Sequence, residues 1–382
     1  MAYELEEEHQ NLRKTAREFA VNEIAPTASA DERARRFPRE IITRMGELGF
    51  FGCPIAEEFG GNNSGFLAHT VACEEIARVS SSIAVAFNTQ SMATARTIAE
   101  FGSDEQKRKY IPKLVSAEWL GCFAVTEPEA GSDVSSIKTT AVKEGGHYRL
   151  NGNKAWISLA QVSDVGILFA YTNPDKGRHG ISAFILDMKA QGVSLSQDQE
   201  KLGWRSMPAA DIFLDDVEVP IDNLLSKEGQ GFEIMMRSFN NIRLTAAARA
   251  VGNSQALIDE VVKYANERVQ FGQEIGRFQM VQNVVAEMVA KTEAARLLTY
   301  RCASQKDGGN LDNTSETSTA KYYAADVASR ISDDAFTIMG AYGCAGQYPL
   351  GRLLRDAKMH QVINGSPNIH KLIIAKHALG YR

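Results

Sequence analysis

The chain has 382 residues, of which 44% are hydrophobic and 23% charged, a balance that excludes disordered, collagen-like and disulfide-scaffold proteins. At roughly 150 residues per domain, this length predicts two or three domains. The formal net charge is only −5, so electrostatics favour neither nucleic acid nor an anionic membrane as a partner.

Targeting signals and metal motifs are missing from the sequence. No apolar run approaches the roughly 18 residues of a membrane span, and the acidic start MAYELEEEHQ does not resemble a signal peptide. The five cysteines are scattered, with no CxxC pair or Cys/His spacing that suggests zinc. We therefore expect a cytoplasmic protein with reduced cysteines and no bound metal.

Residues 1–120 are expected to form a helical N-terminal domain. Their apolar residues recur at the spacing of a helix face, for example at Leu5, Leu12, Ala16 and Phe19. The run EFGGNNSGF at 58–66 predicts a loop. Ser103 is expected to cap a helix that begins at Asp104.

Residues 121–228 are expected to form a β-domain. Six short runs, rich in β-branched or aromatic residues and bounded by Gly, Asn, Asp or Pro, predict an antiparallel sandwich or barrel. These runs are WLGCFAVTE, HYRLNGNKAWIS, VGILFAYT, GISAFILDM, GVSLSQ and DIFLDDVEV.

Residues 229–382 are expected to form a C-terminal helical bundle. Long segments without proline run over 232–268, 275–307 and 317–339, and the run GGNLDN at 308–313 predicts a loop between two of them. Long helices joined by short loops are typical of a bundle. The fold class is therefore mainly α with a central β-domain.

Two segments of the β-domain have residue types that suit a flat, polar cofactor. The run VTEPEAGSD at 125–133 follows a predicted strand and forms a turn. Its backbone amides are expected to bind an anion or the polar edge of a flavin; the alternative is an ordinary β-turn. In KAWIS at 154–158, the Trp156 indole is of the kind that packs against a flat aromatic cofactor, and the Ser158 hydroxyl follows two residues later on the same face of the strand. The alternative is a tryptophan in the hydrophobic core.

Two segments of the helical bundle add to this pattern. In ERVQFGQEIGRFQ at 267–279, Arg268 is of a type that binds a pyrophosphate and Phe271 of a type that packs against an adenine. On its own, this run indicates only a helix end and a turn. In RDAKMHQVINGSPNI at 355–369, Arg355 and Asp356 are expected to form a helix-surface pair. The run INGSPNI is expected to be a loop between helices.

Together and in this order, these four segments resemble the acyl-CoA dehydrogenase family of flavoproteins, over nearly the whole chain. The resemblance implies a helical N-domain, a β-barrel or sandwich, and a C-terminal four-helix bundle. It implies FAD as cofactor, a homotetramer or homodimer, and an electron acceptor such as an electron-transfer flavoprotein. The implied reaction is oxidation of an acyl-CoA or acyl-carrier-protein thioester at Cα–Cβ, in which a carboxylate removes the α-proton.

The resemblance also assigns residues position by position. It assigns FAD binding to Val125, Thr126, Ser132, Trp156, Ser158, Arg268, Phe271, Gln279, Thr337, Gly340, Ala341, Ser366 and Asn368. It assigns substrate binding to Ser132, Asn240, Arg243 and Gly365, with Arg243 near the CoA moiety.

The chain departs from the family at the catalytic base. The family's Tyr-Glu-Gly-Thr loop is replaced by Ile363-Asn-Gly-Ser, so that Asn364 stands where Glu is usual, and Ile242 occupies the alternative base position. Glu129 and His360 are substitute candidates, although Glu129 fits a solvated turn residue and His360 a packed or surface histidine.

Four explanations of the missing base remain open. Asn364 is an engineered replacement of a native glutamate, the base lies elsewhere, the substrate loses CO₂, sulfinate or another leaving group without proton abstraction, or the protein binds flavin and thioester without turnover. A helical interaction protein without flavin is the alternative from another class. The segment Ser82–Met92 carries no charge, which argues against a dicarboxylic acyl chain, while Asn88–Ser91 are compatible with a polar or cyclic acyl group.

Overall fold

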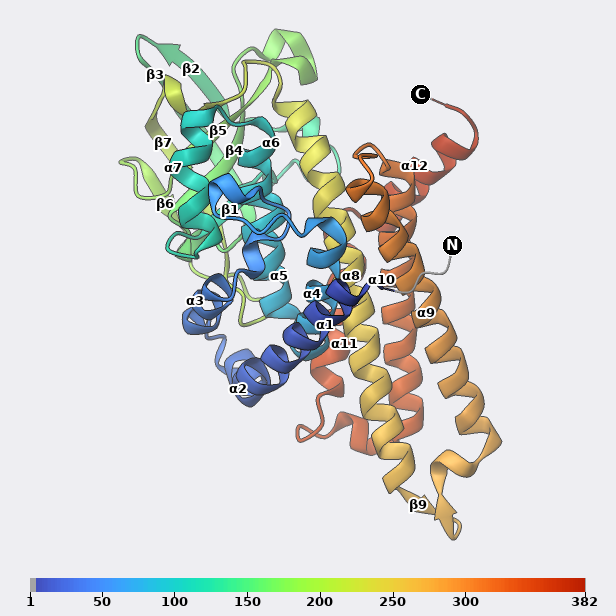
Figure 1. Ribbon diagram of the computed structural model, residues 1–382. Coiled ribbons are helices and arrows are strands. Elements are labelled where there is room, and N and C mark those ends of the chain that lie inside the picture. The colour runs from blue at the N-terminus through green and yellow to red at the C-terminus, as the bar shows by residue number, and fades with distance from the viewer. Residues whose placement is uncertain (1–4, 382) are drawn as a thin grey trace.

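The computed structural model describes residues 5–381, and Figure 1 shows three regions along the chain. Helices at the N-terminal end pack against a β-rich region, and long helices of the C-terminal part lie beside both. The mainly helical fold with a central β-region is confirmed. Within residues 5–381, no helix has the length and apolarity needed to cross a bilayer.

The N-terminal region consists of seven α-helices with two π-helical turns. The turns are at Ala20–Ile24 and Thr89–Ala95. The helices are α1 (Glu7–Phe19), α2 (Ala25–Ala34), α3 (Arg39–Glu47), α4 (Gly65–Val79), α5 (Ser81–Asn88), α6 (Arg96–Phe101) and α7 (Asp104–Val115). Every residue of α5 is buried, so this helix lies inside the protein and not on its surface.

The predicted cap of α7 is confirmed and also has a tertiary role. The Ser103 Oγ atom accepts a hydrogen bond from the Gln106 amide at 3.2 Å, and Gln106 Oε1 accepts one from the Ser103 amide at 3.0 Å. Together these bonds form a capping box. The Gln106 Nε2 atom also donates to the carbonyls of Asp222 and Leu224 at 2.7 and 2.9 Å. One side chain therefore caps a helix and ties it to the sheet region.

The central sheet has eight strands, not six. They are β1 (Gly121–Ala124), β2 (Thr140–Glu144), β3 (His147–Ser158), β4 (Val165–Tyr171), β5 (Ile181–Asp187), β6 (Val193–Leu195), β7 (Ala209–Pro220) and β8 (Leu224–Leu225). Their order is β6-β7-β3-β2-β4-β5-β8, with β1 beside β4.

The expectation of a purely antiparallel sheet is wrong at two strands. The whole of β1 runs parallel to β4, and β2 meets β4 in parallel at Thr140 and Tyr171. The apolar pattern of a strand fixes which face is buried but not the direction of a neighbour that is distant in sequence. The remaining pairs are antiparallel, the longest being β3 with β7.

The C-terminal region is built from five helices. They are α8 (Gly231–Glu267), α9 (Gln279–Asp307), α10 (Thr314–Met339), α11 (Leu350–Val362) and α12 (Pro367–Ala378). The 37-residue α8 starts beside the sheet region and ends at a small hairpin of β9 (Val269–Gln270) and β10 (Gln273–Glu274), seen at the bottom of Figure 1.

Helix α8 crosses α4 so closely that the crossing requires glycine. A Cβ atom on Gly252 would lie 2.3 Å from the backbone oxygen of Glu74, closer than any side chain tolerates. The N-terminal and C-terminal regions therefore share one packed interface along α8.

A carboxylate on α2 fixes part of the sheet region against the helices. The Glu32 side chain, 4% exposed, accepts hydrogen bonds from the backbone amides of Arg205 and Ser206 at 2.8 and 3.1 Å, and from the Ser82 hydroxyl at 2.9 Å. These bonds hold the segment before β7 against α2 and α5. The neighbouring Trp204 is thereby placed in the protein interior, 2% exposed.

Candidate active site

The segment after β1 and the Trp156 segment of β3 are held together by a buried ion pair. Lys154 Nζ, completely buried, lies 2.8 Å from Glu127 Oε1 and 3.3 Å from the carbonyl of Val125. The Ala155 amide donates to the Thr126 carbonyl at 2.8 Å. Two of the four segments singled out in the sequence are therefore adjacent in space.

Glu127 also fixes the chain that follows the 125–133 turn. Its carboxylate accepts hydrogen bonds from the amides of Lys138 and Thr139 and from the Thr139 hydroxyl. Burial acts to raise the pKa of Glu127, but the charge of Lys154 and these hydrogen bonds outweigh it, and the pKa is lowered. Glu127 is therefore a charged anchor of the turn.

Trp156 projects from an irregularity in the sheet. It lies where the pairing of β3 with β7 shifts register, its φ is +60°, and its amide donates to Asp211 Oδ1 at 3.0 Å. Trp156 is 56% exposed, so the alternative of a core tryptophan is wrong. An exposed indole beside half-buried Ser158 and Thr126 provides a flat apolar wall with polar groups next to it, which suits an aromatic ring system.

The turn residues Ser132 and Glu129 lie in solvent. Glu129 is hydrogen-bonded to the equally exposed Lys138, and this bond lowers the pKa of the Glu129 carboxyl. Glu129 has the surroundings of a solvated turn residue, and none of the buried groups described below contacts it.

The hairpin segment that contains Arg268 and Phe271 meets residues 340–344 at the far end of the bundle. The Arg268 guanidinium lies over the Tyr342 ring at 5.1 Å, which brings the hairpin segment next to residues 340–344. Thr337, Gly340, Ala341 and Gln279 are all exposed. Phe271 is 95% exposed and lies in the left-handed region at φ +52°. This end of α8 thus presents an arginine and apolar side chains outward.

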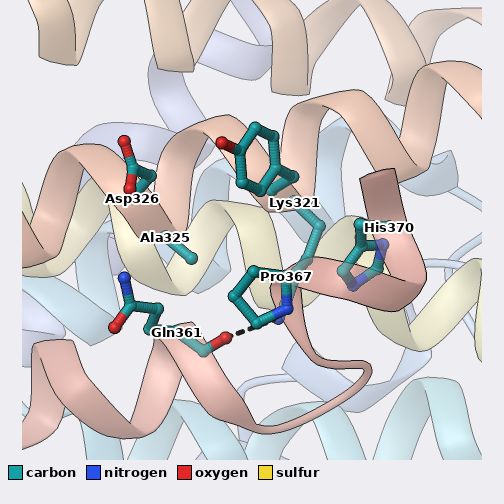
Figure 2. A pocket seen from close by; sticks show the side chains of 7 residues that line it. Lys321, Ala325, Asp326, Gln361, Pro367 and His370 are labelled. Atoms are coloured by element: carbon teal, nitrogen blue, oxygen red, sulfur yellow. Dashed lines mark hydrogen bonds between the residues drawn. The ribbon is translucent and has the colours of Figure 1, made fainter. Parts of the chain in front are cut away.

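The 363–366 loop is fixed between α11 and α12. Lys321 Nζ donates to the carbonyls of Gly365 and Gln361 at 2.7 and 3.4 Å. Figure 2 shows the Lys321 and Gln361 side chains beside a small cavity that His370 and Pro367 also line. A Cβ atom on Gly365 would lie 2.7 Å from His370 Nε2, so this position requires glycine. Ser366 caps α12 by accepting from the Ile369 amide, and Asn368 is exposed.

Asn364 is held by an arginine that the sequence prediction did not include. Arg249 Nη2 on α8 donates to Asn364 Oδ1 at 2.8 Å. Asn364 has φ +60°, a left-handed conformation that asparagine adopts more readily than most residues. Ile242, at the alternative base position, is 4% exposed. Both base positions therefore carry neutral side chains, with Asn364 half-buried and Ile242 buried.

Arg249 has a recognisable signal in the sequence. It is the one charged residue in the run LTAAARAVGN at 244–253, and such a run predicts a buried stretch of helix. Charged residues are almost never fully buried unless they are paired. A lone arginine in this setting therefore marks a candidate site.

His360 belongs to a buried aromatic and polar cluster. It is 2% exposed, its Nε2 lies 3.3 Å from Ser81 Oγ, and its ring centroid lies 5.0 Å from that of Trp204. Burial, reinforced by the charges of Arg249 and Lys321, holds the pKa of His360 well below its usual range. His360 is therefore a packed, neutral histidine.

The expected surface pair Arg355–Asp356 is wrong. Asp356 is 1% exposed and accepts a hydrogen bond from the Trp204 amide at 3.0 Å. Helical periodicity places Asp356 on the inner face of α11, one turn before His360. Burial, with the charge of Glu32, raises the pKa of Asp356 to about 7.

Asp356→Asn is expected to remove a pH-dependent loss of stability. Because the folded-state pKa is raised, the folded protein keeps a proton between about pH 4 and 7 that the unfolded chain releases, so wild-type stability falls as pH rises through this window. Asparagine retains the acceptor for the Trp204 amide without the charge. The variant should gain on the order of 4 kcal/mol over wild type as the pH rises from 4 to 7.5, measured by urea unfolding.

The control for this variant is Asp326→Asn. Asp326 pairs with Arg330 at 2.8 Å one turn along α10, a pair worth about 0.3–0.5 kcal/mol. Unfolding free energies of Asp356→Asn and wild type that run parallel from pH 4 to 7.5 would contradict the prediction.

The two predicted substrate residues on α8 differ in their surroundings. The Arg243 guanidinium lies 5.6 Å from the Phe239 ring centre, and burial lowers its pKa to about 10. Its Nε atom is buried without a partner among residues 5–381. Asn240 is instead engaged in the fold, because its Nδ2 donates to the Leu311 carbonyl at 2.9 Å.

Comparison with known proteins gives the class that this fold and site define. Residues 6–118, 122–217 and 229–379 match the N-terminal, middle and C-terminal domains of acyl-CoA dehydrogenase. The chain belongs to the acyl-CoA dehydrogenase family and is a flavin-dependent oxidoreductase of the type that acts on CH–CH groups.

Individual relatives agree with this assignment. The chain is 45% identical over 385 residues to glutaryl-CoA dehydrogenase of Desulfococcus multivorans, covering 100% of this chain and 99% of that protein. It superimposes with a TM-score of 0.98 on a glutaryl-coenzyme A dehydrogenase–glutaryl-CoA complex (45% identity, covering 100% and 98% of the two chains). PigA with FAD and proline gives a TM-score of 0.95 at 28% identity, covering 100% and 99%.

FAD is the cofactor of this family, and exposed groups of this chain fit it. The uncovered indole of Trp156 and the uncovered ring of Phe271 are the kind of surfaces that an isoalloxazine ring and an adenine cover. The neighbouring Thr126 and Ser158 hydroxyls and the Arg268 guanidinium supply polar groups for the ring edge and the pyrophosphate.

Proposed function

We propose that the enzyme acts on an acyl thioester at Cα–Cβ without a carboxylate base at position 364 or 242. The observation that carries this proposal is the hydrogen bond from Arg249 to Asn364 at 2.8 Å. An amide in this position has no basic lone pair to take an α-proton, and it is already occupied by a donor.

Each group of predicted residues has a role in this proposal. Val125, Thr126, Ser132, Trp156, Ser158, Ser366 and Asn368 hold the flavin ring end, and Arg268, Phe271, Gln279, Thr337, Gly340 and Ala341 the ADP end. Arg243 faces the CoA moiety, and the Gly365 amide polarises the thioester carbonyl. Bound FAD supplies the acceptor for the hydride that leaves Cβ.

Of the substitute bases, burial favours His360 over Glu129. His360 is inside the protein, and its Nδ1 atom has no hydrogen-bond partner among residues 5–381. Its strongly lowered pKa makes it a weak base. Glu129, paired with Lys138 in solvent, lacks a comparable setting.

A second candidate is a reaction that needs no base. Loss of CO₂ from the acyl group breaks a C–C bond and leaves the electron pair on carbon, so that a carbanion forms without proton abstraction. A proton from solvent then completes the C–H bond, and the flavin undergoes no net change. The observation that favours this candidate is the cationic Arg249 beside Asn364, because a cation is the group that would hold the departing carboxylate.

Four further points belong to the proposal. The enzyme passes electrons to an acceptor such as an electron-transfer flavoprotein. It forms a homotetramer or homodimer in which the exposed hairpin of Phe271 reaches a neighbour's FAD. Its five cysteines, none in a disulfide, fit a cytoplasmic location, and its domains divide at about residues 120 and 228.

The test is anaerobic mixing of the flavin-loaded protein with a panel of acyl-CoA and acyl-carrier-protein thioesters. Flavin bleaching with an enoyl thioester product supports oxidation, and release of CO₂ without net flavin reduction supports the second candidate. Binding of several thioesters with neither outcome would overturn both and leave a non-catalytic thioester-binding protein.

A further inference from the structure

Arg249 is a buried cation without a counter-ion. It is 1% exposed, and within residues 5–381 its hydrogen-bond partner is the neutral Asn364, while its Nε atom has none. The Trp204 ring lies 5.2 Å away and offers only a cation–π contact. No carboxylate contributes to the lowered pKa of about 10 that burial gives this guanidinium.

Other basic side chains lie close enough to Arg249 to influence one another. Lys321 is 1% exposed, and burial together with the charges of Arg249 and Arg243 lowers its pKa to about 7. The charges of Arg249 and Lys321 likewise act on His360, and those of Lys321 and Arg243 on His370. Cations from α8 and α10 thus converge around the 363–366 loop.

The position of Arg249 links it to the reacting end of the substrate. Ile242 and Arg249 are seven residues apart on α8 and so lie on one helix face, about 10 Å apart along the axis. Arg249 also touches Asn364. Ile242 is itself on α8, and Asn364 contacts Arg249 on the same helix. Both positions at which the family carries its base therefore lie at or beside residues 242–249 of α8.

A charge in this environment is retained against a large desolvation cost. An unpaired buried ion costs several kcal/mol even after relaxation, and the guanidinium is built to bind a carboxylate through two parallel hydrogen bonds. The glutamate usual at position 364 would have provided such a carboxylate. With asparagine at position 364, none of residues 5–381 supplies a carboxylate to Arg249.

We infer that Arg249 forms a binding subsite for a carboxylate carried by the acyl chain of the substrate. This inference rests on the proposed function and names its substrate class, a short acyl thioester with a carboxylate on the chain. It revises the expectation drawn from the uncharged segment Ser82–Met92, because the cationic anchor comes from α8 instead.

The test compares Arg249→Met with wild type by calorimetric titration of the dithionite-reduced holoenzyme, in which oxidation is blocked. The probes are succinyl-CoA and glutaryl-CoA, with butyryl-CoA and valeryl-CoA as neutral partners of equal length. Wild type should bind at least one carboxylated probe at least tenfold more tightly than its neutral partner. Arg249→Met should lose that preference while its affinity for the neutral probes changes less than threefold.

A stability measurement separates binding from a structural role. Since Arg249→Met removes an unpaired buried charge, the ligand-free variant should unfold at the same or a higher temperature than wild type. Arg330→Gln, an exposed charge loss on α10, is the control and should leave the probe preference unchanged.

The outcomes also separate this inference from the proposed function. If wild type binds neutral and carboxylated probes alike, or if Arg249→Met keeps the preference, the subsite is refuted while thioester chemistry stands. If no thioester binds wild type, the proposed function fails with it.

Discussion

Glu127→Gln is expected to destabilise the protein by about 3–5 kcal/mol, the cost of leaving one member of a buried ion pair without its partner. Lys154 has no exposed surface, and its ammonium lies 2.8 Å from Glu127 Oε1. Glutamine keeps the shape of the side chain but not the charge, and one of its amide hydrogens would face a donor. Urea unfolding measures the loss directly.

The same substitution should weaken flavin retention. Glu127 connects the 125–133 turn to the Trp156 segment through Lys154, and to residues 138 and 139 through backbone amides. Without the Glu127 carboxylate, the segments of Thr126 and Trp156 on either side of the proposed flavin-ring site are no longer connected by an ion pair. The purified variant should therefore carry a lower ratio of flavin to protein absorbance than wild type.

Glu129→Gln is the matched control. Glu129 is two residues away in the same turn, and its partner Lys138 is exposed, so the loss of this exposed ion pair should leave the free energy of unfolding almost unchanged. Full activity of this variant would also eliminate Glu129 as a base. Equal destabilisation by the two variants would refute the buried pair as the anchor.

Asn364→Glu should confer little oxidation of straight-chain acyl-CoA on its own. The new carboxylate would lie within reach of Arg249, and an adjacent cation lowers the pKa of a carboxyl group by about 1–3 units, which weakens it as a base. Glutamate also tolerates the left-handed conformation at φ +60° less well than asparagine.

The double variant Arg249→Gln/Asn364→Glu should show the larger gain. Removing the guanidinium frees the carboxylate to accept the α-proton, and a positioned general base contributes roughly 10²–10⁴-fold in rate. The measurement is the rate of anaerobic flavin bleaching by butyryl-CoA. Arg249→Gln alone is the control and should gain nothing.

Two outcomes would contradict this account. If Asn364→Glu alone reaches the rate of the double variant, Arg249 does not restrain position 364. If neither variant gains activity, residues other than 249 and 364 also prevent oxidation of straight-chain acyl-CoA.

Local patterns predicted the helices of the bundle and the cap of α7. The long run after residue 231 has apolar residues at helical spacing and no proline until the bundle's far end, and Ser103 with Gln106 carries both halves of a capping box. These features depend on residues a few positions apart, which a sequence displays directly.

Features that depend on distant contacts could not be predicted in this way. The two strands that the sequence analysis missed are β2 and β8, and β8 is defined only by the pairing of its two residues with β5. Asp356 looked like a surface residue because its partner, the Trp204 amide, lies 152 positions away in the chain. For the site, the resemblance indicated which base was missing, but only the fold brought Arg249 to Asn364.

The length of α8 has a consequence for how such chains can vary in evolution. Eighteen residues of continuous helix separate Arg249 from the end of α8 at Glu267, and the hairpin of Phe271 follows directly. Deleting one residue anywhere between them would turn the hairpin by about 100° and shift it by 1.5 Å relative to the loop of Asn364. Insertions and deletions among homologues should therefore fall in connections such as residues 308–313, while this stretch of α8 keeps a constant length.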